Sequence, residues 1–221
     1  MSPNLRIRTI VSRPFDENTY VVGRTDRADV LVVDPGFEPN LILDYLRDEG
    51  LTVAAILNTH GHVDHIAGNA AVRRAHPGVP IIIGKGDAAM LTDADLNLSA
   101  PYGLPITSPP ADRTLAEGDR LELAGLEFEV FEIPGHSPGH VVFLLRDKPF
   151  VVIGGDVLFR GSVGRTDLLG GSFEQLRDGI QKKLWPLPDD TVVYPGHGPV
   201  TTIGHEKRTN PFVGPRSEYP I

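Results

Sequence analysis

Cysteine is absent from this chain of 221 residues, and that absence removes several kinds of chemistry at once. A chain without cysteine forms no disulfide, offers no thiolate to a metal ion and has no cysteine nucleophile. This composition suits a reducing compartment, so we expect a cytoplasmic protein. The opening residues, MSPNLRIRTI, are basic but lack the apolar stretch of a secretory signal.

Long apolar runs and an excess of basic charge are also lacking. Because no apolar run is long enough to span a bilayer, we expect no membrane partner. Lysine and arginine total 21 against 29 aspartates and glutamates, which gives a formal net charge of −8. A general nucleic-acid binder would carry a basic face, so we expect no nucleic-acid partner either. Hydrophobic residues make up 40% of the chain, which is enough for a large core.

Short apolar runs bounded by turn residues predict strands along most of the chain. They lie at 5–11, 19–23, 30–34, 53–59, 80–84, 140–146, 150–156 and 191–195. A hairpin is expected over 119–135, with its turn at Ala124 and Gly125. Helices are expected at 39–50, 64–78, 85–95 and 172–187.

Both halves of the chain follow one plan, in which strands precede helices, and no Pro/Gly/Ser-rich linker separates them. A single domain over 1–221 accounts for this order, with an α/β fold that places two sheets inside and helices outside. Residues 92–113 interrupt the plan. A surface connection would explain them, but a loop of this length more often serves as a lid or binding loop. We expect it to border a substrate, with Tyr102 and Leu104 as contacts.

Four apolar runs end alike, in histidine or aspartate beside glycine. They are AAILNTHGHVDH, FEVFEIPGHSPGH, FVVIGGD and TVVYPGHG. Ligands gather at the carboxyl ends of strands, where loops converge, so these side chains are expected to meet at one end of the sheets. Four such recurrences argue against a set of unrelated core histidines. The residues are His60, His62, Asp64, His65, His136, Asp156 and His197.

The spacing within HGHVDH indicates that one short segment can serve two metal ions. His60 and His62 lie two positions apart, so on an extended segment they project the same way. Asp64 and His65 are adjacent and fall at an expected helix start, so they point differently. Seven nitrogen and oxygen ligands without sulfur suit two divalent ions, with Zn²⁺ first and iron or manganese as alternatives.

The remaining histidines are given other roles. His140 opens the strand after PGHSPG and is interpreted either as support that orients a metal ligand or as plain packing. His76 is expected at the surface near a helix end, and His205 in a structural or surface position.

These motifs resemble the metallo-β-lactamase superfamily, whose T-H-x-H-x-D-H signature corresponds to THGHVDH, followed by PGHSPGH, GGDVLF and PGHG. The resemblance covers nearly the whole chain and implies a four-layer αβ/βα sandwich of two mixed sheets flanked by helices. It also implies two metal sites, with Asp156 as the bridging ligand. The first site would comprise His60, His62 and His136. The second site would comprise Asp64, His65 and His197.

Two longer stretches, GDVLFRGSVGRTDL and GHGPVTTIGHEKRTNPF, are similar to the glyoxalase II-like branch, the short bacterial hydroxyacylglutathione hydrolases. This similarity implies that a metal-bound hydroxide hydrolyses a small acyl thioester such as S-lactoylglutathione. The thiol leaves as a thiolate, so no strong general acid is required. Asp64 would act in catalysis by ligating and by holding the hydrogen bond of the hydroxide.

Substrate selection is less strongly implied. Full-length glyoxalase II carries a basic C-terminal helical extension for glutathione, and after His197 this chain runs only to Ile221. We therefore expect weak selection for glutathione. Arg165 would contact a substrate carboxylate or, equally, form an ion pair with Asp167. Asn18 resembles a position near the family's site and is a candidate substrate contact.

Rival interpretations remain within and outside the family. A persulfide dioxygenase with one iron, held at His60, His136 and Asp156, uses the same scaffold and a similar GRTD stretch. A non-catalytic metal-binding protein would also retain the fold, although all seven ligands are intact. His62 argues against the flavodiiron oxygen reductases, which have glutamate there, and the short acidic chain argues against the RNA-processing nucleases. The oligomeric state is left open.

Overall fold

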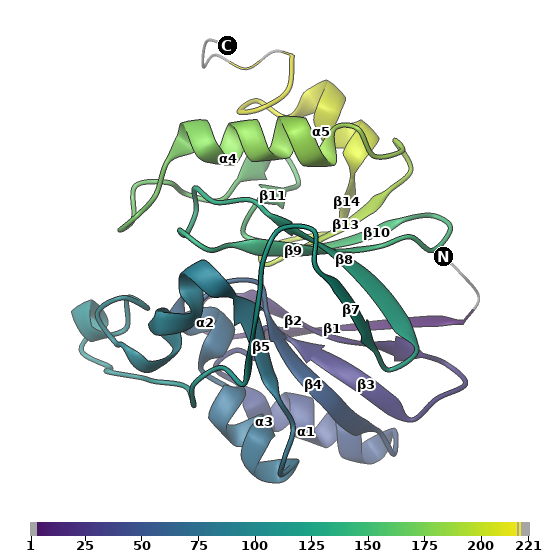
Figure 1. The fold of residues 1–221 in the computed structure, drawn as a ribbon, viewed down its shortest axis with the longest axis vertical. Coiled ribbons are helices and arrows are strands. Elements are labelled where there is room, and N and C mark those ends of the chain that lie inside the picture. The colour runs from purple at the N-terminus through teal and green to yellow at the C-terminus, as the bar shows by residue number, and fades with distance from the viewer. Residues whose placement is uncertain (1–3, 216, 218–221) are drawn as a thin grey trace.

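The computed structural model describes residues 4–215 and 217, and two six-stranded sheets pack face to face in it (Figure 1). The first sheet has the order β1-β2-β3-β4-β5-β6. Its strands are β1 (Leu5–Ser12), β2 (Glu17–Arg24), β3 (Asp29–Val33), β4 (Thr52–Asn58), β5 (Ile81–Gly84) and β6 (Arg113–Leu115). Pairing is antiparallel between the first three strands and parallel from β3 to β6.

The second sheet has the order β14-β13-β10-β9-β8-β7. Its strands are β7 (Arg120–Leu123), β8 (Leu126–Glu132), β9 (Val141–Leu145), β10 (Val151–Gly155), β13 (Val192–Pro195) and β14 (Thr201–Thr202). Only β10 and β13 pair in parallel, so this sheet is mixed as well. A small hairpin of β11 (Leu158–Phe159) and β12 (Ser162–Val163) stands apart from both sheets.

Helices cover the outer face of each sheet, which gives four layers (Figure 1). The first sheet is covered by α1 (Pro39–Asp48) and α3 (Asn69–Ala75), and the second by α4 (Phe173–Gly179), the π-helical turn η3 (Ile180–Leu184) and α5 (Ile203–Thr209). The predicted α/β class and αβ/βα sandwich are therefore confirmed. None of the helices among residues 4–215 is both long and apolar enough to cross a membrane.

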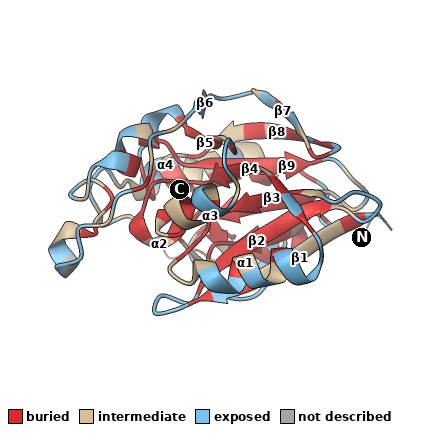
Figure 2. Cartoon of the chain, turned by 90° about the horizontal axis from the view of Figure 1, so that it is seen from below, coloured by how far each residue is buried: buried red, intermediate tan, exposed pale blue. Residues whose placement is uncertain are grey.

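Apolar side chains on alternate strand positions form the layer between the sheets. Leu31 and Tyr20 from the first sheet meet Phe128 and Phe143 from the second, and all four are buried. Figure 2 shows that buried residues are concentrated in the strands, whereas exposed residues lie on the outer helices and loops. Burial of these side chains thus fixes the two sheets against each other and keeps their ends side by side.

Several predicted elements are confirmed with small changes of boundary. The helix predicted at 39–50 ends at Asp48, with Gly50 in the left-handed region at φ 63°. Ala124 and Gly125 form the predicted hairpin turn, with φ of 51° and 70°, as a two-residue type I′ turn requires.

The helix predicted at 64–78 is wrong as one element. It is divided into α2 (Val63–Ile66) and α3, with a break at Gly68. The amide of Gly68 donates to the carbonyl of Pro35 at 2.8 Å, and a Cβ on this glycine would lie 2.7 Å from the carbonyl oxygen of Gly36. The close approach of another backbone thus interrupts the helix here.

Other short elements also differ from the predictions. The helix expected at 85–95 is the 3₁₀ segment η1 (Lys85–Thr92), and the helix expected at 172–187 is α4 followed by η3. Four short strands were missed, namely β6, β11, β12 and β14, together with helix α5. These runs are two to seven residues long, and runs of that length show little periodicity.

Candidate metal centre

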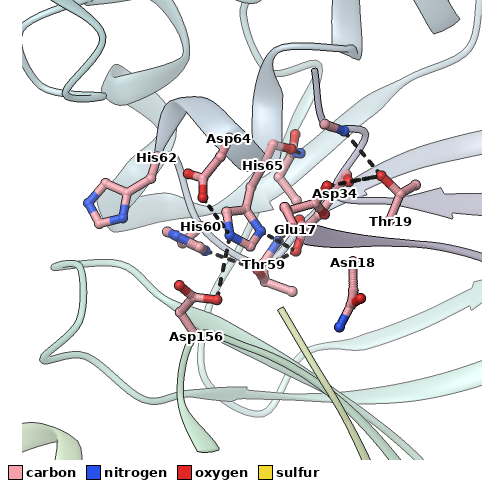
Figure 3. A network of polar contacts seen from close by, with 12 residues as sticks. Glu17, Asn18, Thr19, Asp34, Thr59, His60, His62, Asp64, His65 and Asp156 are labelled. Atoms are coloured by element: carbon pink, nitrogen blue, oxygen red, sulfur yellow. Dashed lines mark hydrogen bonds and ion pairs between the residues drawn. The ribbon is translucent and has the colours of Figure 1, made fainter. Parts of the chain in front are cut away.

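All seven predicted ligands come together at one end of the two sheets. His60 and His62 follow β4, and Asp64 and His65 lie on α2. The second sheet supplies its residues from the ends of β8, β10 and β13, namely His136, Asp156 and His197. Figure 3 shows His60, His62, Asp64 and His65 facing Asp156, which comes from the second sheet. The expectation that four strand ends converge is therefore met by the fold.

One set of possible ligands consists of His60, His62 and His136. Their ligand atoms all lie within 4.8 Å of one another, and all three side chains are buried. His62 Nδ1 lies 2.9 Å from His136 Nε2, whereas the buried Nε2 of His60 has no hydrogen-bond partner. Three imidazole nitrogens thus point into a single space.

A second set consists of Asp64, His65 and His197, again with ligand atoms within 4.8 Å of one another. Asp64 Oδ2 lies 3.3 Å from His197 Nε2 and 3.7 Å from His65 Nε2. The Nε2 of His65 is buried without a hydrogen-bond partner. This set is open on one side, since 26% of the His197 side chain is exposed.

Asp156 stands between the two sets. Its Oδ2 lies 3.4 Å from His136 Nε2 of the first set and 3.5 Å from His197 Nε2 of the second. Its Oδ1 lies 3.5 Å from His65 Nε2 and has no hydrogen-bond partner. One carboxylate therefore touches both sets, which is the position expected of a shared ligand.

Hydrogen bonds behind three histidines fix which ring nitrogen faces the site. The Nδ1 atoms of His136 and His197 reach the backbone carbonyls of Arg165 and Phe15, at 2.8 and 3.1 Å. His65 Nδ1 lies 3.1 Å from Asp34 Oδ2. With Nδ1 donating in each case, the Nε2 lone pair is directed inward, where a metal ion would need it.

The protonation states differ between the sets. Burial, with neighbouring histidines, lowers the pKa of His60 well below its usual value, and burial and His136 lower the pKa of His62 to about 3. For His65, burial acts to lower the pKa, but Asp64, Asp156 and Asp34 outweigh it, so the pKa is raised. For Asp64, burial acts to raise the pKa of the carboxyl, but the nearby histidines outweigh it and hold that pKa well below the usual range.

This donor set fits divalent metal ions. Buried imidazole nitrogens and carboxylate oxygens without partners are costly unless a further group satisfies them. Three of the buried atoms without a hydrogen-bond partner, Nε2 of His60, Nε2 of His65 and Oδ1 of Asp156, belong to the converging sets. Nitrogen and oxygen donors without sulfur are typical of zinc, iron and manganese sites.

Two buried aspartates that the sequence analysis missed support these loops. Asp34 accepts hydrogen bonds from the amide and hydroxyl of Thr59, at 2.7 and 2.6 Å, in addition to its contact with His65. Its oxygens are thus occupied, although it lies within ligand distance of His60 and His65. The signal was available, because VLVVDPG is another apolar run that ends in aspartate near glycine.

Asp87 ties the two histidine loops of the first set together. It accepts hydrogen bonds from the Gly61 amide at 3.1 Å, the Ser137 hydroxyl at 2.6 Å and the Gly139 amide at 2.5 Å. Burial raises the pKa of its carboxyl. No local pattern distinguishes Asp87 in KGDAAM, because its partners lie 26 to 52 residues away.

His140 lies behind the site. Its Nε2 accepts a hydrogen bond from the Asp156 amide at 3.0 Å, and its ring stacks on His60 with centroids 4.8 Å apart. Gly155 adopts φ 47°, and a Cβ there would lie 2.7 Å from His140 Nε2. These contacts match the position expected of a residue that orients ligands.

The three candidate substrate contacts have different positions. Asn18 is buried, and its amide donates to the carbonyls of Pro195 at 3.0 Å and Gly198 at 2.8 Å, so it braces the turn that carries His197. Arg165 lines the cavity but also makes the alternative ion pair with Asp167, at 2.7 and 2.8 Å. The side chain of Tyr102 lies outside the described part of the structure.

A cavity of about 350 Å³ opens above the two sets. The long loop does border it, but through Asn97 and Leu98. The expectation that Leu104 makes the contact is corrected, since Leu104 is 58% exposed and Leu98 lines the cavity in its place. The remaining histidines lie elsewhere, with His76 partly exposed and His205 near the surface on α5.

Comparison with known proteins gives a consistent result. The family model described as the metallo-beta-lactamase superfamily matches residues 12–197. The probable metallo-hydrolase YqgX of Bacillus subtilis is 42% identical over 202 residues, covering 90% of this chain and 93% of that protein. The hydroxyacylglutathione hydrolase GloC of Haemophilus influenzae is 37% identical over 215 residues, covering 96% of this chain and 100% of that protein.

Solved structures agree with the sequence relatives. The BLEG-1 B3 metallo-beta-lactamase superposes with a TM-score of 0.90 and 40% identity, covering 94% of this chain and 99% of that one. TTHA1623 in a di-iron-bound form gives 0.82 and 41%, covering 93% and 99%. ETHE1 from Myxococcus xanthus gives 0.77 and 29%, covering 94% and 84%. In fold, motifs and overall similarity, this chain belongs to the metallo-β-lactamase superfamily.

Proposed function

We propose that this chain is a metal-dependent hydrolase that cleaves a small acyl thioester, in the manner of a hydroxyacylglutathione hydrolase. The observation that carries the proposal is the position of Asp156, within 3.5 Å of histidines from both ligand sets at the floor of an open cavity. A shared carboxylate of this kind suits two ions close enough to act on one water molecule.

Most residues of the site would hold metal ions, and Asp64 would also orient the attacking oxygen. Divalent ions in the two sets, most readily zinc, with iron or manganese as alternatives, would lower the pKa of a water molecule and polarise a carbonyl oxygen. Asp64 faces the same cavity and can accept a hydrogen bond from the attacking oxygen, which orients it. His136 and His197 are held by backbone carbonyls, so their inward nitrogens need no reorganisation.

The reaction balances without a further cofactor. Water adds to the acyl carbon, the carbon–sulfur bond breaks, and a carboxylate, a thiol and one proton are formed. Since a thiolate is a good leaving group, the absence of a strong general acid is no obstacle. Similarity to GloC, which is described as a hydroxyacylglutathione hydrolase, supports the same substrate class.

A second candidate is a persulfide dioxygenase with a single iron at His60, His136 and Asp156. The structural similarity to ETHE1 favours it, and the same three side chains converge here. The complete second set of Asp64, His65 and His197 supports the two-ion hydrolase instead. Similarity to a protein described as a B3 metallo-beta-lactamase adds β-lactam cleavage as a third activity to test.

One panel of activity assays distinguishes these candidate functions. Protein loaded with zinc, manganese or iron would be assayed with S-lactoylglutathione, glutathione persulfide under oxygen and a chromogenic cephalosporin. We expect release of thiol from the thioester as the main activity. Oxygen uptake with the persulfide by the iron form alone would transfer the assignment to the dioxygenase. Metal binding without turnover of any substrate would favour a non-catalytic metal-binding protein.

A further inference from the structure

The cavity above the ligand sets has an apolar wall. The apolar side chains that line it are Phe15, Val63, Leu98, Phe159, Val163 and Leu168, and Asn97 and Arg165 line it beside them. Phe159 stands edge-on to His197, with ring centroids 6.1 Å apart, so the apolar surface begins directly beside a ligand. A substrate group next to the scissile bond therefore meets hydrocarbon surface.

Positive charge on this wall is already matched by a carboxylate. Arg165 lines the cavity, and Asp167 accepts two hydrogen bonds from its guanidinium in a bidentate pair. An anionic thiol carrier would have to compete with that carboxylate for the cation. The wall is thus better suited to an uncharged group than to a carrier with free carboxylates.

Leu98 is held in an unusual backbone conformation on this wall. Its φ is 68°, in the left-handed region that a bulky side chain other than glycine rarely adopts. Residues around it fix the loop, because the buried Asn97 side chain donates to the carbonyls of Met90 and Ile106 at 3.1 and 2.9 Å. The Asn97 carbonyl also accepts from the Val63 amide at 3.0 Å. Strained residues that their surroundings hold in place tend to cluster at ligand sites.

We propose that the substrate carries an apolar, uncharged group of several carbons beside the thioester, and that Leu98 is the residue that selects for it. This inference rests on the proposed thioester hydrolysis and narrows its substrate class. The apolar group can belong to the acyl part or to the thiol part, because both parts of a thioester adjoin the scissile bond.

Two homologous series distinguish these sources. In the first, the acyl group lengthens from acetyl to hexanoyl on a fixed thiol, N-acetylcysteamine. In the second, lactoyl is fixed and the thiol lengthens from butanethiol to hexanethiol, with glutathione as the charged comparison. Burial of one CH₂ corresponds to at most about a fourfold gain in binding, so we expect kcat/KM to rise about two- to fourfold per CH₂ in at least one series.

Two substitutions test the role of Leu98. Leu98→Gly and Leu98→Asn both suit the left-handed backbone, so neither should lower Tm as a leucine truncation in the core would. Both should flatten the rise of kcat/KM with chain length, chiefly through KM. Leu104→Gly removes an exposed leucine from the same loop and serves as the matched control, with the slope retained.

Failure of this inference can be distinguished from failure of the proposed thioester hydrolysis. If thioesters are cleaved but kcat/KM is flat or falls in both series, the apolar-group inference is wrong while the hydrolase stands. A slope that survives in both Leu98 variants would remove Leu98 as the selecting residue. If no thioester is cleaved at all, the proposed function itself fails, and the inference fails with it.

Discussion

The two ligand sets differ in their access to solvent. His60, His62 and His136 are all buried, whereas the second set leaves 26% of the His197 side chain and 16% of the Asp64 side chain exposed. The first set therefore resembles a pre-formed structural site, and the second lies where a substrate would enter. Burial also lowers the pKa of His60 and His62 in the first set, while in the second set neighbouring carboxylates outweigh burial and raise the pKa of His65 and His197.

The largest effect is expected where the two sets meet. Asp156→Ala removes the carboxylate that touches both, so thioester hydrolysis should fall by about a thousandfold or more. Both the kcat of the metal-loaded variant and its metal content should be measured. Asp48→Ala, at an exposed carboxylate on α1, is the control and should change kcat by less than about threefold. Near-normal activity in Asp156→Ala would show that the two ligand sets act separately, which would contradict a shared role for this carboxylate.

Single-ligand variants should distinguish the sets by metal content. His136→Ala should empty the buried first set, and His60→Ala should do the same. His197→Ala should mainly weaken the second set and leave about one ion per chain. Elemental analysis after dialysis against a weak chelator measures this directly. Metal content unchanged from that of the parent protein in all three variants would contradict the assignment of these ligands to two sets.

The supporting aspartates should have smaller, set-specific effects. Asp87→Asn removes an acceptor shared by the loops of His60 and His136, so metal affinity of the first set should fall about 10- to 100-fold. Asp34→Asn disturbs His65 and Thr59, so the second set should weaken by a similar factor. Competition titrations with a coloured chelator would resolve the two affinities. If each substitution weakened both sets equally, neither aspartate would support one ligand set specifically.

The remaining effect concerns pH. The raised pKa values of His65 and His197 mean that their protons must leave before an ion binds. Second-set affinity should therefore fall by about tenfold per pH unit for each proton displaced as pH is lowered from about 8 to about 6. First-set affinity should fall less steeply, because the pKa of His62 lies at about 3 and that of His60 is also lowered. Parallel losses from both sets would refute this difference.

Sequence patterns could predict the sheets and the ligands because both leave local signals. Apolar runs marked every long strand, and each ligand followed such a run beside a glycine. The supporting aspartate Asp87 left a weaker signal, because its hydrogen-bond partners lie far along the chain. The break at Gly68 depends on a carbonyl of Pro35 that only the fold brings near. Likewise, the choice between a substrate contact and an Asp167 ion pair for Arg165 depended on side-chain geometry.

The central claim, that both ligand sets serve one reaction, is tested most directly by rebuilding activity from metal-free protein. Zinc would be added in steps from zero to three equivalents, and hydrolysis of an acyl thioester would be followed alongside bound metal. The account predicts low activity at one equivalent, when the buried set is filled, and a steep rise that ends at two. Full activity at one equivalent, with no change as the second ion binds, would contradict it.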